Sequence, residues 1–335
     1  MISSSKLLFF VRRCTALICC FSLLCLVSAC GDKDNKNLIV VGFSQLGAES
    51  DWRIANTKSM TEAFSEENGY ELIFDNAMQR QENQLVAIRN FILQGVDIIV
   101  LAPVAETGWD DVLLEAKNAG IPVIIVDREV SVPDESLYLS AIGSDFLAEG
   151  QLAVQKLDEI LTARGMTNRP INILHLKGTD GATAQIMRTK AIGDAAVEKL
   201  DWHICASLPG EFTEAKGYEE VRNYISRNRN INVIYSENDN MTFGAMRALD
   251  EAGLTYGENG DIIIVSFDAG RRALNECLAG RINLCVECNP LHGPKVDELI
   301  KQYRAGQEIP KHIHVDEGYF TPSTLTQEII DSRKY

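Results

Sequence analysis

The sequence predicts an α/β fold with two doubly wound parallel-sheet lobes. Short apolar runs typical of buried strands alternate with segments of helical periodicity, which is the pattern of a parallel sheet covered by helices. The series then occurs a second time at similar length, which favours two lobes built alike. A chain of 335 residues is long enough to give each lobe its own core.

The first series contains five strand-like segments, at residues 38–43, 70–74, 97–101, 122–126 and 137–142. Helical patterns lie between them at 52–67, 79–93 and 107–119. Gly69, Gly95 and Gly120 fall just after these helices, where a left-handed C-cap favours glycine.

The second series has strand-like segments at 171–176, 202–207, 231–235, 262–267 and 282–287. Its helical patterns fall at 145–163, 183–200, 213–227, 241–251 and 271–278. A further helix at 290–305 and a short strand at 312–315 follow, which indicates that the chain crosses back to the first lobe. Residues 324–333 are expected to form a short terminal helix.

The N-terminal segment 1–29 has the layout of a secretory signal, with a short basic region, an apolar run and small residues at its end. The residues before and including Cys30, LVSAC, resemble the bacterial lipobox, which implies cleavage before Cys30 and lipid attachment to its thiol. A single anchoring helix and an ordinary signal peptide are the alternatives. Residues 30–37 are expected to be a polar linker between this anchor and the folded part.

Removal of residues 1–29 takes away three positive charges and no negative ones, so the net charge moves from −15 to −18. A protein this acidic is a poor candidate for binding nucleic acid. The remaining composition, with 46% hydrophobic and 24% charged residues, is that of an ordinary globular protein.

The motifs that would indicate an enzyme are missing from the sequence. It contains no phosphate-binding GxxxxGK[ST], no GxSxG and no HExxH. Cys285 and Cys288 form a CxxC on a predicted strand, where side chains three apart point to opposite faces, so neither a zinc site nor a redox pair is expected. The sequence leaves undecided whether Cys277 forms a disulfide with one of these two cysteines. We expect no catalysis, no cofactor and no metal.

Polar and aromatic residues recur just after the predicted strands of both series. Ligands of such sheets bind beyond the carboxyl ends of the strands, where loops and helix N-termini meet. In the first series these residues are Ser44, Glu49, Trp52, Arg53, Asp127 and Arg128. In the second series they are Arg188, Phe212, Asn238 and Asp268. An aromatic ring beside charged hydrogen-bonding groups suits a small polyhydroxylated ligand.

The ordered motifs VGFSQLGAESDWR, DNAMQRQENQ, APVAETGW, IIVDRE, KGTDGATAQIMRTK, PGEFTEAKG, YSENDNM and VSFDAG resemble the periplasmic sugar-binding proteins of ABC importers. The similarity is to the type I, ribose- and galactose-binding class, and within it to the galactofuranose-binding members. It implies two lobes joined by a hinge of three crossings, near Ser144, Asn289 and Asp316. The first lobe would comprise 38–143 with 288–315, and the second 144–287 with 316–335.

The resemblance also implies a set of sugar contacts. From the first lobe these are Ser44, Glu49, Ser50, Trp52, Arg53, Asp127 and Arg128; from the second, Arg188, Phe212, Asn238 and Asp268. The carboxylates would accept hydrogen bonds from sugar hydroxyls, the arginines would donate, and Trp52 and Phe212 would sandwich the apolar ring faces. Asn56 and Cys288 depart from the residues of related binders, which favours the general prediction of a monosaccharide over galactofuranose itself.

The predicted function is therefore that of a lipid-anchored, monomeric, extracytoplasmic binding protein that delivers a monosaccharide to an ABC permease. The alternative is a sugar sensor that signals through a chemoreceptor or a sensor kinase. The transcription-regulator branch of the fold is excluded, because an apolar secretory segment stands where that branch has a basic helix-turn-helix.

Overall fold

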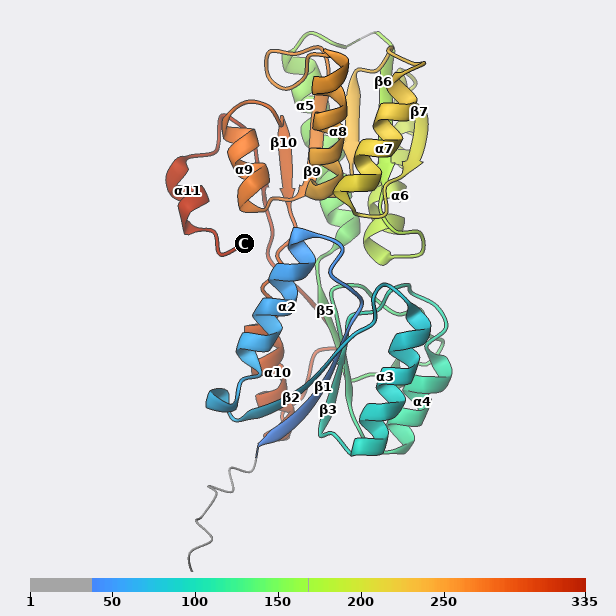
Figure 1. The fold of residues 1–335 in the computed structure, drawn as a ribbon, viewed down its shortest axis with the longest axis vertical. Helices are drawn as coiled ribbons and strands as arrows, with labels where there is room; N and C mark the ends of the chain where they lie inside the picture. Colours follow the sequence, from blue (N-terminus) through green and yellow to red (C-terminus); the bar gives the residue numbers. More distant parts are fainter. Residues whose placement is uncertain (1–37, 168) are drawn as a thin grey trace, which may run out of the picture. The chain divides into compact units, whose positions relative to one another are not determined.

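The computed structural model describes residues 38–167 and 169–335. The predicted signal peptide 1–29, the lipidation site Cys30 and the linker up to residue 37 lie outside the described residues. The described part contains two six-stranded sheets, each flanked by helices on both faces (Figure 1). The predicted fold class is confirmed.

The first sheet has the strand order β11-β5-β4-β3-β1-β2, and all its neighbours pair in parallel. Its strands are β1 (Ile39–Gln45), β2 (Tyr70–Asn76), β3 (Ile98–Leu101), β4 (Val123–Val126), β5 (Ser140–Gly143) and β11 (His312–His314). Helices α2 (Asp51–Ala63) and α10 (Gly293–Arg304) cover one face, and α3 (Gln81–Gln94) and α4 (Asp110–Asn118) cover the other (Figure 1). This sheet with its helices is called the first lobe below.

The second sheet has the order β12-β10-β9-β8-β6-β7. Its strands are β6 (Ile171–Lys177), β7 (Trp202–Pro209), β8 (Val233–Ser236), β9 (Ile263–Asp268), β10 (Leu284–Glu287) and β12 (Tyr319–Phe320). Its helices are α5 (Phe146–Ala163), α6 (Thr183–Glu198), α7 (Glu214–Ile225), α8 (Asp239–Ala252), α9 (Arg271–Leu278) and α11 (Gln327–Ser332). This sheet with its helices is called the second lobe.

The two lobes share one physical plan. Central strands such as β3 and β4 are buried along their whole length, as expected for a parallel sheet covered on both faces. In the second lobe α5 and α6 pack on one face, and α7, α8 and α9 pack on the other. The carboxyl ends of the strands in each sheet therefore carry the loops that are free to bind a ligand.

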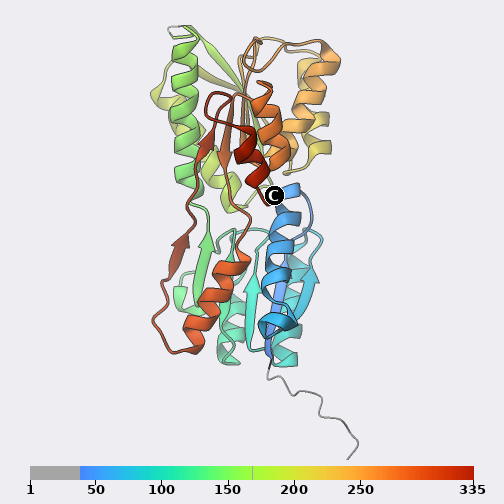
Figure 2. The same cartoon turned by 90° about the vertical axis from the view of Figure 1, so that its left-hand side faces the viewer.

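The chain passes between the sheets three times, after β5, after β10 and after β11. Figure 2 shows β11 at the edge of the first sheet, next to β5, and the chain continuing from it into the second lobe. The lobe boundaries implied by the resemblance remain a prediction.

Several predicted boundaries are wrong by three or more residues. The helices expected at 107–119, 290–305 and 324–333 begin only at Asp110, Gly293 and Gln327. The helix expected at 52–67 ends at Ala63, and a separate 3-10 turn, Glu66–Asn68, leads to Gly69 with its positive φ of 91°. The strand expected at 137–142 begins only at Ser140, because Asp134 caps a 3-10 turn, Glu135–Leu137, by accepting from the Ser136 N–H at 2.9 Å. Strand β12 was not predicted; it is two residues long and pairs antiparallel with β10.

Among the described residues no helix is both long and apolar enough to cross a bilayer. The thiols of Cys205, Cys277, Cys285 and Cys288 are free, so the disulfide left open by the sequence is not formed here.

Candidate functional site

A pocket with a cavity volume of about 30 Å³ lies between the carboxyl ends of strands from both lobes. It is lined by Glu49, Ser50, Trp52, Arg53, Asp127, Arg128, Arg188, Phe212, Asn238 and Asp268. These are all the predicted site residues except Ser44. Ser44 is buried near the end of β1, with its Oγ 3.5 Å from Gln84 Nε2, and does not line the pocket.

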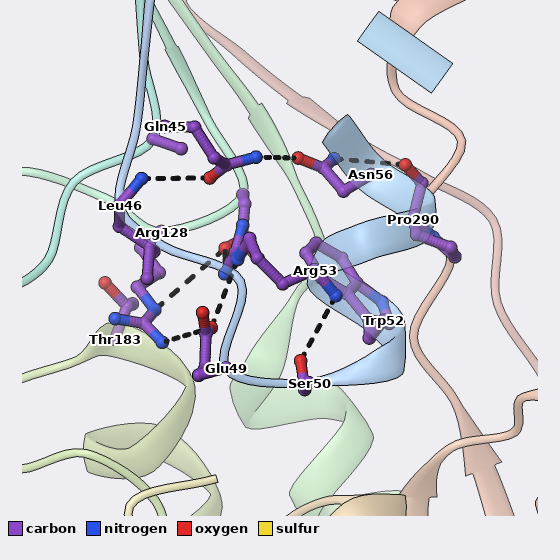
Figure 3. Close-up of polar contacts among 12 residues, drawn as sticks. Gln45, Leu46, Glu49, Ser50, Trp52, Arg53, Asn56, Arg128, Thr183 and Pro290 are labelled. Atoms are coloured by element: carbon purple, nitrogen blue, oxygen red, sulfur yellow. Dashed lines mark hydrogen bonds and ion pairs between the residues drawn. The ribbon is translucent and has the colours of Figure 1, made fainter. Parts of the chain in front are cut away.

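Helix α2 presents the first group of polar side chains (Figure 3). Ser50 caps the helix, since its Oγ accepts from the Arg53 N–H at 3.1 Å. The Arg53 guanidinium donates to Glu49 Oε1 at 3.2 Å and also to Asp127. Burial lowers the pKa of Arg53, but the Asp127 and Glu49 carboxylates outweigh burial and hold this pKa above its usual value.

Arg128 lies beside this group and is 3% exposed. Its Nη1 donates to the Val104 carbonyl at 2.7 Å, and its Nη2 lies 3.7 Å from Glu49 Oε1. Burial, followed by the neighbouring charge of Arg53, lowers its pKa to about 10, so it still carries its charge at neutral pH. Its guanidinium carbon stands 5.3 Å from the centre of the Phe212 ring of the other lobe.

Arg188 is the cation of the second lobe. Its Nε donates to Glu149 Oε2 at 2.8 Å, and its Nη1 donates to the Glu237 carbonyl at 2.6 Å. Burial lowers its pKa, but Glu149 outweighs burial, so the guanidinium stays charged. Glu149, in the first turn of α5, was not identified from the sequence as part of the site.

Three pocket residues, Asp127, Phe212 and Asp268, have left-handed backbones, with φ of 66°, 59° and 99°. Non-glycine residues rarely adopt this conformation, and when they do they are often found at functional sites. Asp127 and Phe212 each follow a strand and Asp268 ends β9, so each turn directs a side chain into the space between the lobes.

Gly178 makes room for the Phe212 ring. A Cβ on Gly178 would lie 1.9 Å from Phe212 Cζ, which no side chain tolerates. Asn238 fixes the same loop, because its Nδ2 donates to the Phe212 carbonyl at 3.0 Å while its Oδ1 caps α8 by accepting from the Met241 N–H at 2.9 Å.

Asp268 is 6% exposed and lies beside Asp239. Burial raises the pKa of Asp268 well above its usual value, and the Asp239 carboxylate raises it further, whereas Arg188 lowers it. Asp239 accepts from Ser266 Oγ at 2.6 Å and from the Gly270 N–H at 2.8 Å. The pocket therefore has an acidic group, Asp268, that ionises less readily than an ordinary exposed aspartate.

Helix α2 is also tied to the segment that follows β10. Asn56 Nδ2 donates to the Pro290 carbonyl at 3.0 Å, and Asn56 Oδ1 accepts from Gln45 Nε2 at 3.0 Å (Figure 3). Asn56 Nδ2 also lies 3.3 Å from His292 Nδ1. Burial lowers the pKa of His292 to about 4, so its ring is neutral and its Nδ1 can accept. Asn56 thus holds the helix rather than lining the pocket.

Three hydrogen bonds join the lobes directly. The Asp51 N–H donates to Asn240 Oδ1 at 3.0 Å, the Glu129 N–H to Thr183 Oγ1 at 2.9 Å, and the Glu106 N–H to the Gly181 carbonyl at 3.0 Å. The described arrangement is therefore one in which the lobes are closed on each other.

Phe146, Ala184 and Cys288 also line the pocket, and none of them was predicted as a contact. Phe146 opens α5 directly after the β5 strand end, so the rule applied to the other strands would have found it. Ala184 gives no chemical signal in a sequence. The sequence indicates Cys288 only as a departure from the residues of related binders.

Three polar atoms of the pocket residues have no hydrogen-bond partner: Glu49 Oε2, Arg53 Nη1 and Arg188 Nη2. The last of these still lies 2.6 Å from Glu149 Oε2 as an ion pair. Buried polar groups normally have partners, so an acceptor and a donor are available here to a hydroxyl-bearing ligand. One group of potential metal ligands lies close together in the described part of the chain: Glu149, Cys288 and Glu317, with ligand atoms within 4.8 Å of one another. The Arg188 cation already pairs with Glu149 and disfavours a metal ion there.

Comparison with known proteins gives one consistent picture. A model described as "periplasmic binding protein domain" matches residues 41–291. The galactofuranose-binding protein YtfQ of Escherichia coli is 37% identical over 295 residues, which are 87% of this chain and 90% of that protein.

Two solved structures are similar over most of the chain. A Mycobacterium smegmatis protein in complex with β-D-fucofuranose has a TM-score of 0.80 and 40% identity, covering 85% of this chain and 92% of that one. The arabinose ABC transporter binding protein of Shewanella sp. ANA-3, bound to α- and β-L-arabinofuranose, has a TM-score of 0.81 and 39% identity, covering 88% and 95%.

Proposed function

The chain belongs to the periplasmic binding protein domain family, and we propose that it captures a neutral monosaccharide in its furanose form and delivers it to the permease of an ABC importer. The observation that carries the proposal is the pocket, to which both lobes contribute charged groups and aromatic rings. Its residues bind and orient a ligand, and we propose that they catalyse no reaction.

The charge balance of the pocket favours a neutral ligand. Arg53 and Arg128 lie among the carboxylates of Glu49 and Asp127, and Arg188 is paired with Glu149. Because each cation already has a carboxylate nearby, a phosphate or carboxylate on the ligand would meet no free positive charge. Hydroxyl groups, in contrast, can both donate to Glu49 Oε2 and accept from Arg53 Nη1.

The descriptions of similar proteins support a furanose. Relatives that are at least 36% identical carry galactofuranose, fucofuranose or arabinofuranose in their descriptions. Trp52 and Phe212 would contact the two apolar faces of the furanose ring.

Binding would be coupled to closure of the lobes. Trp52 and Asp127 come from the first lobe and Arg188 and Asp268 from the second, so a ligand that contacts both sets stabilises the closed arrangement. The permease would then receive the closed, loaded form.

Calorimetric titration with two anhydrogalactitols tests this function, one locked in the five-membered ring and one in the six-membered ring. They differ in ring size but carry no bulky substituent, and galactose serves as the natural mixture of ring forms. We expect the five-membered ring to bind at least tenfold more tightly, a difference of about 1.4 kcal/mol. Preference for the six-membered ring would overturn the furanose assignment, and failure of every monosaccharide to bind would overturn the function.

We also propose that Cys30 carries a lipid that anchors the protein to a membrane, as the LVSAC sequence supports. A Cys30→Ala variant should leave the membrane fraction and lose labelling by a radioactive fatty acid. Cys205→Ala, which removes an exposed thiol of the folded part, is the matched control and should stay labelled. A labelled, membrane-bound Cys30→Ala variant would refute the anchor.

A further inference from the structure

The three connections between the lobes meet at one carboxyl group, that of Glu317. Glu317 lies between β11 and β12, on the third connection. Its Oε1 accepts from Ser144 Oγ at 2.7 Å and from the Asn289 N–H at 2.5 Å. Ser144 follows β5 and Asn289 follows β10, so a single oxygen atom contacts both of the other connections.

A second carboxyl group, that of Glu149, lies against the first. One oxygen of Glu149, one of Glu317 and the Cys288 sulfur are within 4.8 Å of one another. Glu149 is 4% exposed, and its Oε2 accepts from Arg188. Its Oε1, however, is buried and has no donor. Two ionised carboxylates this close would repel each other, and one acceptor would stay unsatisfied.

A proton held by Glu317 would remove both penalties, because a protonated carboxyl is a donor as well as an acceptor. Burial, and next the charge of Glu149, raise the pKa of Glu317 to about 9. Arg188 stays with Glu149, so Glu149 is the carboxylate of the two that remains ionised.

The groups around the pair agree with this assignment. The charged or titratable side chains facing it are Glu149 on α5, Arg188 on α6, Asp268 at the end of β9, Cys288 after β10, and the Glu287–Arg333 ion pair next to Gly318. Burial raises the pKa of the Cys288 thiol well above its usual value, so this thiol is neutral and adds no charge. Arg188 is the cation that contacts the pair, and it bonds to Glu149.

We propose that Glu317 is a positioning residue of the sugar site. It carries a proton at neutral pH, uses that proton to donate a hydrogen bond to the Glu149 carboxylate, and thereby holds Glu149 where it orients Arg188. Through this hydrogen bond the connections between the lobes are coupled to the pocket. Glu317 lies on the third connection and contacts the other two, while Arg188 lines the pocket. The part of this inference that concerns Arg188 and the ligand rests on the proposed function.

The first experiment needs no ligand. The free energy of unfolding of the purified protein is measured across the pH range for wild type, Glu317→Gln and Glu308→Gln. The folded protein holds a proton on Glu317 that the unfolded chain releases above its ordinary pKa, so wild-type stability falls with rising pH up to about 9. In Glu317→Gln, whose neutral amide can donate to Glu149, the free energy of unfolding should depend less steeply on pH, by the contribution of one bound proton. Glu308→Gln, which changes an exposed carboxylate, should keep the wild-type dependence. Equal slopes in wild type and Glu317→Gln would overturn the proposal.

The second experiment measures sugar affinity below and above the pKa of about 9. Wild type should bind more weakly on the alkaline side, Glu317→Gln should bind equally on both sides and match neutral wild type, and Glu317→Ala should be weaker throughout by roughly tenfold. Loss of neutral-pH affinity in Glu317→Gln as large as that in Glu317→Ala would overturn the positioning role.

The two experiments separate this inference from the proposed function. If wild type binds no sugar, the proposed function fails while the unfolding slopes still decide whether Glu317 carries the proton. Stabilisation of wild type, but not of Glu317→Gln, by added Zn²⁺ would overturn the proposal, because the cluster would then be a metal site.

Discussion

The indole of Trp52 is hydrogen-bonded to the connection that follows β10: its Nε1 donates to the Cys288 carbonyl at 2.8 Å. The ring also meets His292 of the same connection edge to face, with the ring centres 5.8 Å apart. The aromatic wall of the pocket is therefore fixed to a segment that runs between the lobes. A change at Trp52 should alter both ligand contact and closure.

Trp52→Phe should reduce sugar affinity by roughly 10- to 100-fold, because it removes the indole hydrogen bond and part of the ring that faces the ligand. Calorimetric titration measures this. Trp109→Phe is the matched control: Trp109 Nε1 also donates to a backbone carbonyl, that of Ala105 at 2.7 Å, and the ring is buried but does not line the pocket. The control should lower thermal stability and leave affinity unchanged. Equal sugar affinities of Trp52→Phe and wild type would show that Trp52 does not contribute to ligand binding.

Gly178→Ala should weaken sugar binding by at least about tenfold, because the new methyl group would occupy the position of the Phe212 ring and force it to move. Gly193→Ala is the control, since a Cβ there meets nothing within 4 Å. In the middle of α6 it should raise stability by about 0.5–1 kcal/mol and leave binding as it is. Affinity and thermal unfolding measured on both variants check the pair; unaltered binding in Gly178→Ala would mean that Phe212 is not a ligand contact.

The fold and most of the pocket could be predicted from the sequence because both depend on local patterns. Alternating apolar runs and helical periods predict parallel sheets, and a polar residue after a strand, such as Asp127, predicts a place at the ligand-binding edge. Ser44 satisfied the same rule, yet it is buried against Gln84, since a strand-end residue can also face inward.

The supporting residues could not be predicted in this way. Glu149 and Glu317 are far apart in the chain and resemble ordinary helix and loop carboxylates until the connections bring them together. The role of Asn56 likewise depends on its contacts with Pro290 and His292, which belong to a segment more than two hundred residues later. Strand β12 is too short to give a periodic signal.

Thr183→Val should lower sugar affinity by roughly 5- to 10-fold without changing the pocket lining. Thr183 Oγ1 accepts from the Glu129 N–H across the lobes at 2.9 Å, and valine keeps the shape but not the acceptor, so the closed form becomes less favourable than the open one. Thr61→Val, which removes a hydroxyl that bonds only within α2, is the control. Small-angle scattering without ligand should show a more open average in Thr183→Val alone. The same affinity loss in both variants would argue against a role in closure.

Asp239 makes stability depend on pH. It is 4% exposed, and burial raises its pKa to about 7. The unfolded chain releases this proton near its ordinary pKa of about 3.9, so the folded protein holds a proton that the unfolded chain lacks between about pH 4 and pH 7. The stabilising effect of this proton is fully present below about pH 4 and is lost as the pH rises to about 7, by up to about 1.4 kcal/mol per pH unit.

Asp239→Asn should remove that dependence, because an asparagine amide can accept from the Gly270 N–H and donate to Ser266 without carrying a charge. Urea unfolding at a series of pH values measures the slope. Asp180→Asn, at a carboxylate that is 76% exposed and paired with Lys177, should keep the wild-type slope. If Asp239→Asn instead retains the full decline between about pH 4 and pH 7, the proton resides on another group, and Asp268, which lies beside it and also has a raised pKa, is the residue to substitute next.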